Sequence, residues 1–215
     1  MAEKKTTASP FDFAARWEQW VALAKTVLPN FTVDDYNRPV MQALLAYFHQ
    51  HPSQCQAMKI SRQKGILLLE PVGSGKTTLM QLFAARRFRM ITAREIARQF
   101  LKEGYPVLDR YGSQSFGRKH TGYAATLCYD QPITYCFDDL GVEQNIKLYG
   151  NDCNVMAEVL LDRYDQFVQR GMQTHLTTNL NAEELERLYG DRLRSRMREM
   201  FNLVAFSQGA PDRRL

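Results

Sequence analysis

The stretch Glu70-Pro71-Val72-Gly73-Ser74-Gly75-Lys76-Thr77-Thr78 decides the fold of this chain. Before it, the apolar run GILLL at residues 65–69 predicts a buried strand, and after it, LMQLFAA at residues 79–85 predicts the start of a helix. A strand, a glycine-bearing loop and a helix in this order are the context of a phosphate-binding P-loop. A Gly/Ser-rich turn with an incidental lysine is the alternative, which the flanking strand and helix disfavour.

The predicted loop offers both backbone and side-chain groups to a phosphate chain. Backbone N–H groups of the loop and of the helix N-terminus would surround the phosphates. Lys76 would place its charge near the terminal phosphates, and the Thr77 hydroxyl would hold Mg²⁺. The nucleotide-binding residues that we predict are Pro71, Val72, Gly73, Ser74, Gly75, Lys76, Thr77 and Thr78.

One position departs from the P-loop pattern G-x-x-x-x-G-K-[ST], which has its first glycine where this chain has Glu70. Gly73 and Gly75 keep a close approach of the backbone to phosphate possible. A carboxylate at the mouth of the loop would either weaken nucleotide binding or point away from the nucleotide, and the sequence leaves both outcomes open.

Length and charge narrow the class of protein. The chain has 215 residues, which suffice for one α/β domain with a helical extension, or for two small domains at most. Hydrophobic residues make up 45% of it, enough for a full core. The net charge of +5 permits a nucleic-acid partner without requiring one.

The sequence predicts a cytoplasmic protein that does not engage a membrane. No apolar run approaches the ~20 residues that span a bilayer. Residues 1–9 are polar and lack the apolar segment of a secretion signal. The cysteines form no Cys-x-x-Cys pair, and no histidine lies at ligand spacing from them, so we predict reduced thiols at Cys55, Cys128, Cys136 and Cys153.

Two helices are predicted before residue 60. Ser9-Pro10-Phe11-Asp12 has the cap, proline and acid of a helix start, so the first helix should run from there to about Leu28. The second should begin near Pro39 and end near His49, before a polar connection over residues 52–64. The apolar face of the first helix either packs on the domain behind it or docks a partner protein; it comprises Phe13, Trp17, Trp20, Val21, Ala24 and Leu28.

Residues 105–130 are expected to form the least regular part of the chain, an insertion after a short strand near 86–91 and a helix ending at Gly104. Aromatic and basic side chains alternate within it, a mixture that can hold single-stranded nucleic acid by stacking and by phosphate contacts. Arg118, Lys119 and Tyr123 are our candidates for those contacts. A solvated surface loop is an equally valid interpretation.

Polar residues follow two further predicted strands. The run ITYCFDDLG at 133–141 is an apolar strand that ends in paired acids. Downstream of a P-loop, Asp138 can anchor the Mg²⁺ shell, and Asp139 can orient or deprotonate the attacking water. The strand at 173–178 ends at Asn179, whose amide would lie beside the phosphate site and position water. We interpret His175 within this strand as a core or face-packing residue rather than a catalyst.

The last third of the chain is predicted to hold a long helix capped near residues 151–152, a helix that begins with a capping box at 181–184, and a closing strand at 202–206. Arg192 and Arg196 are four residues apart and share a helix face. With Arg194 and Arg198 they form either a solvated face or a nucleic-acid patch.

These motifs, in this order, resemble the DnaC/IstB branch of AAA+ ATPases, which includes bacterial helicase loaders and the ATPase subunits of certain transposons. The resemblance covers roughly residues 60–210. It is carried by the P-loop, DDLG at 138–141, TTNL at 177–180 and GDRLRSR at 190–196. TTNL followed by YGDRLRSRM is the most specific part, because P-loops occur in many families.

The resemblance implies an α/β fold, a P-loop NTPase of AAA+ type with a five-stranded parallel sheet flanked by helices. It divides the chain into a short helical N-terminal extension, residues 1–60, and an ATPase domain, residues 61–215. We expect no C-terminal lid domain. In relatives of the initiator type, the position of the insertion carries extra helices that contact single-stranded DNA.

The same resemblance implies roles for individual residues and for ligands. ATP and Mg²⁺ would be the cofactors, with Lys76 and Thr77 in Walker A and Asp138 and Asp139 in Walker B. Asn179 would be sensor 1. Arg196 matches the arginine finger that reaches the ATP of a neighbouring subunit, and Arg192 is the alternative finger. The implied partners are single-stranded DNA, a replicative helicase or a transposase, and further copies of the chain in a ring or helical filament.

Two hypotheses about function follow. The first is an ATPase that assembles head-to-tail on DNA and delivers a replicative helicase or a transposase. The second is a nucleotide-gated adaptor that binds ATP, barely hydrolyses it and recruits a partner. Glu70 and Asp139 favour the second hypothesis. Glu70 replaces the first P-loop glycine, and Asp139 stands where many AAA+ proteins have glutamate. Aspartate at the latter position is nevertheless common in this branch. The sequence does not separate replication from transposition.

Overall fold

The structure is a computed structural model that describes residues 12–28, 31–69, 75–84, 87–120, 128–143, 146–148 and 151–206. The chain divides into two compact units, Met1–Ile60 and Ser61–Leu215. Among the described residues, no helix has both the length and the apolar character that crossing a bilayer requires.

The first unit consists of three helices, α1 (Phe13–Val27), α2 (Arg38–Phe48) and α3 (Pro52–Ala57). The cap of α1 is Asp12, whose carboxylate accepts the N–H groups of Ala14 and Ala15, so this helix begins later than the predicted start at Ser9, which lies outside the described residues. The polar connection predicted from residue 52 was wrong for its first part. His51 caps α3 by accepting the N–H of Gln54, a side-chain contact that periodicity does not reveal.

The predicted apolar face of α1 is partly covered within its own unit. Trp17, Trp20 and Ala24 are buried. The guanidinium of Arg38, from α2, lies 5.7 Å from the centre of the Trp17 ring, and the Phe31 ring meets the Trp20 ring edge-on with 5.9 Å between centres. These contacts give the two tryptophans a packing role.

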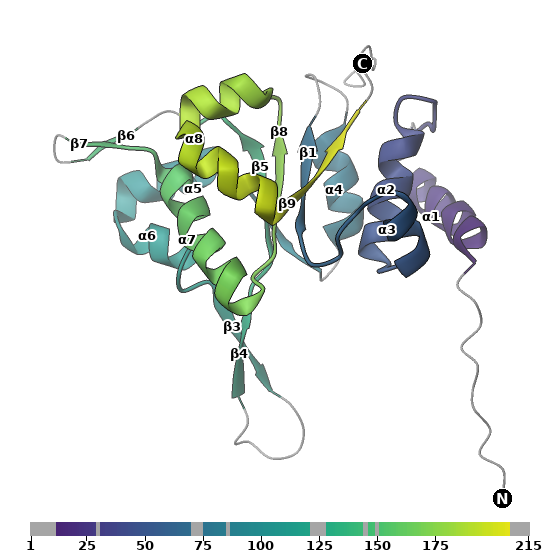
Figure 1. Ribbon diagram of the computed structural model, residues 1–215, viewed down its shortest axis with the longest axis horizontal. Coiled ribbons are helices and arrows are strands. Elements are labelled where there is room, and N and C mark those ends of the chain that lie inside the picture. The colour runs from purple at the N-terminus through teal and green to yellow at the C-terminus, as the bar shows by residue number, and fades with distance from the viewer. Residues whose placement is uncertain are drawn as a thin grey trace, which may run out of the picture. The chain divides into compact units, whose positions relative to one another are not determined.

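The second unit is built on a five-stranded parallel sheet, as predicted (Figure 1). Its strands are β1 (Gly65–Leu69), β2 (Arg89–Thr92), β5 (Tyr135–Leu140), β8 (Thr174–Thr178) and β9 (Phe201–Ala205). They lie in the order β2-β5-β8-β1-β9, and every neighbouring pair is parallel. Parallel strands require crossover helices, so both faces of the sheet are covered.

The crossover helices are α4 (Lys76–Ala84), α5 (Ala93–Glu103), α6 (Pro106–Tyr111), α7 (Val155–Arg170) and α8 (Ala182–Met200). Leu67, Phe137 and Leu176 share one face of the sheet and join the core formed with α5, α7 and α8. Figure 1 shows α4 on the opposite face. Because side chains alternate along a strand, the residues directly before and after each of these three face the α4 side of the sheet.

His175 lies on that opposite face and is a core residue, as predicted. Its Nδ1 accepts the backbone N–H of Ile66 at 3.0 Å, and its ring meets Phe88 edge-on with 4.9 Å between centres. The side chain is buried, and burial lowers its pKa to about 3. The imidazole is therefore neutral at physiological pH and accepts rather than donates at Nδ1.

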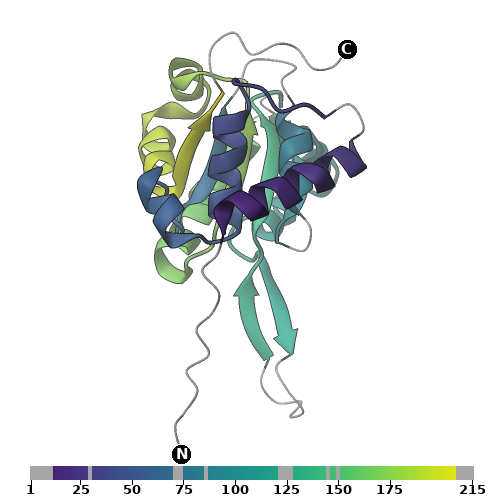
Figure 2. The same cartoon turned by 90° about the vertical axis from the view of Figure 1, so that its right-hand side faces the viewer.

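The irregular insertion predicted at 105–130 was wrong in its structure. This segment contains α6 and a β-hairpin of β3 (Phe116–His120) and β4 (Cys128–Pro132), which runs away from the sheet (Figure 2). A second hairpin, β6 (Ile146–Leu148) with β7 (Asn151–Cys153), was not predicted, and α7 begins only after its cap Asn154. Two-stranded ribbons bury little apolar surface, so their sequences lack the alternation that marks core strands.

A buried arginine fixes both ends of the insertion. Arg163, on α7, is fully buried and donates to the carbonyls of Tyr111, Ile133 and Gln173, each at 2.9 Å. Its Nε donates to the Thr174 hydroxyl at 2.6 Å. Burial lowers the pKa of this guanidinium to about 9, so it remains charged at neutral pH. One side chain therefore binds the backbone both before and after the β3–β4 hairpin, at Tyr111 and at Ile133.

Candidate functional site

Lys76 and Asn179 meet at the carboxyl edge of the sheet, where the ends of parallel strands converge. Lys76 is the first residue of α4, and Asn179 directly follows β8. The Lys76 Nζ donates to the Asn179 Oδ1, although the lysine is only 5% exposed. Gly75 precedes the helix with a φ of +98°, a conformation that favours glycine. Two predicted site residues more than a hundred positions apart in sequence are therefore neighbours.

Thr77 and Asp138 form the second contact of the site. The Thr77 hydroxyl lies 2.9 and 3.1 Å from the two Asp138 carboxylate oxygens. Mg²⁺ prefers oxygen ligands and takes one or two groups from the protein together with substrate phosphates. A hydroxyl facing a carboxylate fits that preference. Among the described residues no cluster of three or more His, Cys, Asp or Glu could hold a metal.

The charge of Asp138 is set by opposing influences. The side chain is 4% exposed, and burial raises its pKa. Hydrogen bonds from Thr177 and Thr77 lower the pKa again, the neighbouring Asp139 raises it, and the Lys76 ammonium lowers it. Burial is the largest of these influences and leaves the pKa of Asp138 raised, while the two hydroxyl hydrogen bonds and the Lys76 ammonium favour the ionised form.

A β-bulge shapes the end of β5. The pairing of β5 with β8 shifts register between Phe137 and Leu140, and Asp139 has a φ of +54°, which is uncommon for a non-glycine residue. Bulges of this kind re-aim side chains beside active sites. Asp139 lies within this bulge, and its charge is close enough to raise the pKa of Asp138.

Thr177 holds this bulge, a role that sequence reasoning missed. Its hydroxyl donates to the Asp138 Oδ1 at 2.6 Å and accepts the backbone N–H of Asp139 at 2.9 Å. The adjacent Thr178 donates to the Leu140 carbonyl at 2.7 Å and accepts the N–H of Leu180 at 3.1 Å. The only sequence signal was the TTN run itself, in which the threonines could be read as ordinary strand residues.

For a site that hydrolyses ATP with Mg²⁺, as the sequence motifs imply, replacing Thr177 with valine should slow hydrolysis by roughly 10- to 100-fold, because hydrogen bonds to charged groups contribute about 1.5–3 kcal/mol. Valine keeps the β-branched shape but loses both hydroxyl bonds. The measurement is the turnover rate as a function of Mg²⁺ concentration. Thr177→Ser keeps the hydroxyl and is the control, so equal rates in the two variants would show that the hydroxyl does not position the acids.

The two candidate arginines lie elsewhere, on the second half of α8. The predicted capping box is present, because Asn181 and Glu184 accept from each other's backbone N–H. The helix is then interrupted at Gly190, with φ of 80° and ψ of 160°. Beyond this kink, Arg192 is exposed, and the guanidinium of Arg196 lies 4.7 Å from the centre of the Tyr164 ring. Within the described ranges, neither arginine joins the cluster around Lys76 and Asp138.

Several predicted residues are placed only in part. Arg118 and Lys119 lie on β3, opposite Asp130 and Tyr129 of β4. Tyr123 and Glu70 lie outside the described residues. So do four of the predicted phosphate-binding residues, namely Pro71, Val72, Gly73 and Ser74. Thr78, the last of the predicted P-loop residues, is half-buried in the first turn of α4.

The chain was compared with known proteins. No protein-family model and no curated protein sequence matches it. Among solved structures, a protein described as a primosome component from Streptococcus pyogenes serotype M3 aligns over 87% of both chains with a TM-score of 0.56 at 18% identity. DnaI aligns over 84% of this chain and 90% of its own, with a TM-score of 0.52 at 18% identity.

A replication initiator, DnaA, bound to AMPPCP and single-stranded DNA, aligns over 86% of this chain and 51% of its own, with a TM-score of 0.51 at 19% identity. At these identities the likeness is one of fold. The AAA+ fold that the sequence motifs implied is therefore confirmed, and this chain spans about half the length of the initiator.

Proposed function

We propose that this chain is an AAA+ protein that binds and hydrolyses ATP, assembles on DNA and recruits or loads a replicative helicase. One observation carries the proposal: two hydrogen-bonded pairs, Lys76 with Asn179 and Thr77 with Asp138, lie together at the carboxyl edge of the five-stranded parallel sheet. The fold likeness to a primosome component and to DnaI supports a replication role over the transposition role of IstB-type subunits.

The chemistry follows from the placement of each group. Lys76 would bind the terminal phosphates, and Thr77 with Asp138 would hold Mg²⁺, which neutralises phosphate charge when bound. Asn179, already bonded to Lys76, would orient the attacking water toward the phosphate that the lysine contacts. Asp139 would polarise that water from the bulge beside it. Arg196 or Arg192 would complete the site of a neighbouring copy.

A second candidate is the nucleotide-gated adaptor with little hydrolysis. The observation that favours it is Asp139, whose side chain is one methylene shorter than glutamate and starts from a backbone constrained by the bulge. A carboxylate held short of the water would leave ATP binding intact and lower turnover.

An ATPase assay on the purified chain, with and without single-stranded DNA, separates the two candidates. We expect turnover that rises with protein concentration and with added DNA, because a site completed by a neighbour requires assembly. Saturable ATP binding without turnover under all conditions would favour the adaptor. Absence of ATP binding would contradict both.

The β3–β4 hairpin is the proposed contact to single-stranded DNA. It extends from the sheet (Figure 2), and its first strand carries Arg118 and Lys119. Arg163 holds the backbone on both sides of the hairpin. Reversing both charges to glutamate should weaken DNA binding and reduce the dependence of the affinity on salt, since fewer phosphates are neutralised. Tyr123→Ala should cost roughly 1–3 kcal/mol if a base stacks on it.

The measurement is a titration of labelled oligonucleotide at several salt concentrations. The matched control reverses two exposed charges on α1, Arg16 and Lys25, and so changes net charge equally. Equal affinity and equal salt slope in the hairpin and control variants would make the hairpin an ordinary surface element.

A further inference from the structure

One carboxylate joins the turn after Asp139 to helix α8. The chain turns back after β5, with the Val142 N–H donating to the Asp139 carbonyl at 3.3 Å. The Glu143 Oε2 accepts the N–H of Gly141 at 2.8 Å, and its Oε1 accepts the hydroxyl of Tyr189. A single side chain therefore closes the turn that carries the paired acids and binds it to a different element.

The same turn packs directly on the residue after Asn179. Gly141 has a φ of +101°, and a Cβ there would lie 2.3 Å from a methyl carbon of Leu180. The Leu140 carbonyl also accepts the Thr178 hydroxyl at 2.7 Å. The end of β5 and the tip of β8 thus form one tightly packed unit, and displacement of either tip would be transmitted to Glu143.

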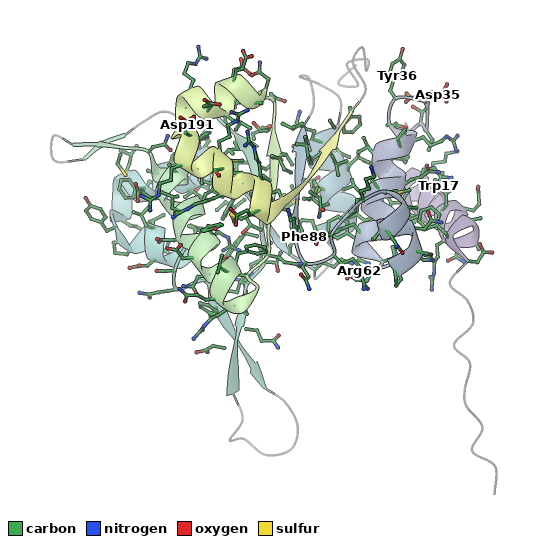
Figure 3. All side chains as sticks on the ribbon, viewed as in Figure 1. Trp17, Asp35, Tyr36, Arg62, Phe88 and Asp191 are labelled. Carbon is green, nitrogen blue, oxygen red and sulfur yellow. The ribbon has the colours of Figure 1, made fainter. Side chains whose placement is uncertain are left out.

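Tyr189 is the residue immediately before the kink in α8. At Gly190 the backbone leaves helical geometry, and the helix resumes with Asp191, which Figure 3 labels on this element. The first half of the helix is held by the Asn154 side chain, whose amide donates to the Leu188 carbonyl at 2.9 Å. An ion pair between Glu186 and Arg194 spans the kink. The second half is also held by its own contacts, because Leu193 and Met197 are buried in the core and the Tyr164 hydroxyl donates to Glu199 at 2.9 Å. Tyr189 is held at the point where the two halves join, and so contributes to the angle between them.

The bond between Glu143 and Tyr189 is costly to make. Both side chains are half-buried, and burial raises the pKa of the Glu143 carboxyl while hydrogen bonds from Tyr189 and Gly141 lower it. Apolar groups of the same shape would pack here without the penalty of desolvating a carboxylate. The Glu143 carboxylate accepts one hydrogen bond from the turn that follows Asp139 and one from α8, the helix that carries Arg192 and Arg196. This arrangement indicates that Glu143 links the two elements.

We propose that Glu143 and Tyr189 are positioning residues that link the Asp138–Asp139 turn to the second half of α8, and so set the direction in which Arg192 and Arg196 are presented to a neighbouring copy. This inference rests on the proposed function, because it requires an arginine that acts in another subunit. Neither residue is assigned a contact with nucleotide.

The test uses complementation between two inactive variants. Lys76→Ala keeps its arginines but lacks a working P-loop, and Arg196→Ala has the reverse defect, so mixed assemblies should regain hydrolysis. We then add Tyr189→Phe to the Lys76→Ala chain, which supplies only the arginine. We expect at least a tenfold loss of the regained rate, with co-purification of the two chains unchanged.

Two further variants test the same link from its other side and control for a general loss of stability. Glu143→Gln, added to the Lys76→Ala chain, can still accept the Gly141 N–H and donate its amide to the Tyr189 oxygen, so it replaces a charged hydrogen bond by a neutral one and should give a smaller loss in the same direction. Tyr111→Phe, added in its place, is the control, because it removes a buried phenol bond to Gln99 of 2.9 Å elsewhere in the same unit. It should leave the regained rate unchanged, which excludes a general loss of stability as the cause.

The possible outcomes distinguish failure of the proposed function from failure of the Glu143–Tyr189 link. If Lys76→Ala and Arg196→Ala chains form mixed assemblies without hydrolysis, the proposed function fails and the link fails with it. If they regain hydrolysis and the added Tyr189→Phe and Glu143→Gln changes have no effect, the link alone is overturned. Loss of hydrolysis only with those two changes supports it.

Discussion

Replacing Lys76 with alanine is expected to abolish ATP binding. Lys76 is the only positive side chain in residues 70–78, so no other group in the loop can offer a charge to the terminal phosphates. Its ammonium is nearly buried and already directed by the hydrogen bond to Asn179, so little reorganisation precedes its contact with phosphate. A preorganised buried cation contributes more than an exposed one.

Titration with a fluorescent ATP analogue, with and without Mg²⁺, measures this effect. Thermal unfolding should accompany it, because Lys76 also lowers the pKa of Asp138 and its loss leaves that carboxylate less compensated. The control is Lys102→Ala, an exposed lysine in the last turn of α5. Unchanged nucleotide affinity in the Lys76 variant would rule out this placement of the site.

The sequence predicted those features of the site that depend on chain order. In a parallel sheet, the residues that follow each strand converge at one edge, so a lysine after one strand, an aspartate ending a second and an asparagine after a third must approach each other. Lys76, Asp138 and Asn179 do so. Strand β1 and the first part of β5 were recognisable as apolar runs because they are buried, whereas the number of strands was implied by the family resemblance.

Features that depend on contacts between distant side chains were not predictable. The hydroxyl of Thr177 acts through a bulge, and no local pattern marks an aspartate that takes a positive φ. Arg163 reads as an ordinary charged residue of an amphipathic helix, although it is fully buried against three carbonyls. Glu143 and Tyr189 are 46 residues apart, and only the fold makes them partners.

Replacing Arg196 with alanine is expected to leave ATP binding intact and to remove most hydrolysis. Phosphoryl transfer spreads negative charge over the γ-phosphate oxygens, and an arginine finger there contributes about 10³–10⁵ in rate. Arg196 lies on α8, on the opposite face of the sheet from α4, and its guanidinium contacts Tyr164. Within the described residues it lies apart from the cluster around Lys76, as we would expect of an arginine that acts in the site of the next copy.

This assignment makes turnover depend on assembly through a head-to-tail contact, which closes a ring or extends a filament. The rate per chain should rise with protein concentration in the natural sequence and stay low in Arg196→Ala. Arg192→Ala, one helical turn away, tests the alternative finger, and Arg187→Ala, exposed before the kink, is the control.

Mixing Arg196→Ala with Lys76→Ala should restore part of the activity, because some interfaces then pair an intact P-loop with an intact arginine. In random mixed assemblies only interfaces of one polarity are competent, so the regained rate should pass through a maximum near equal amounts of the two chains. Co-purification of differently tagged chains shows that mixed assemblies exist. Normal hydrolysis by Arg196→Ala alone, or inactive mixed assemblies, would each contradict the assignment of Arg196 to a neighbour's site.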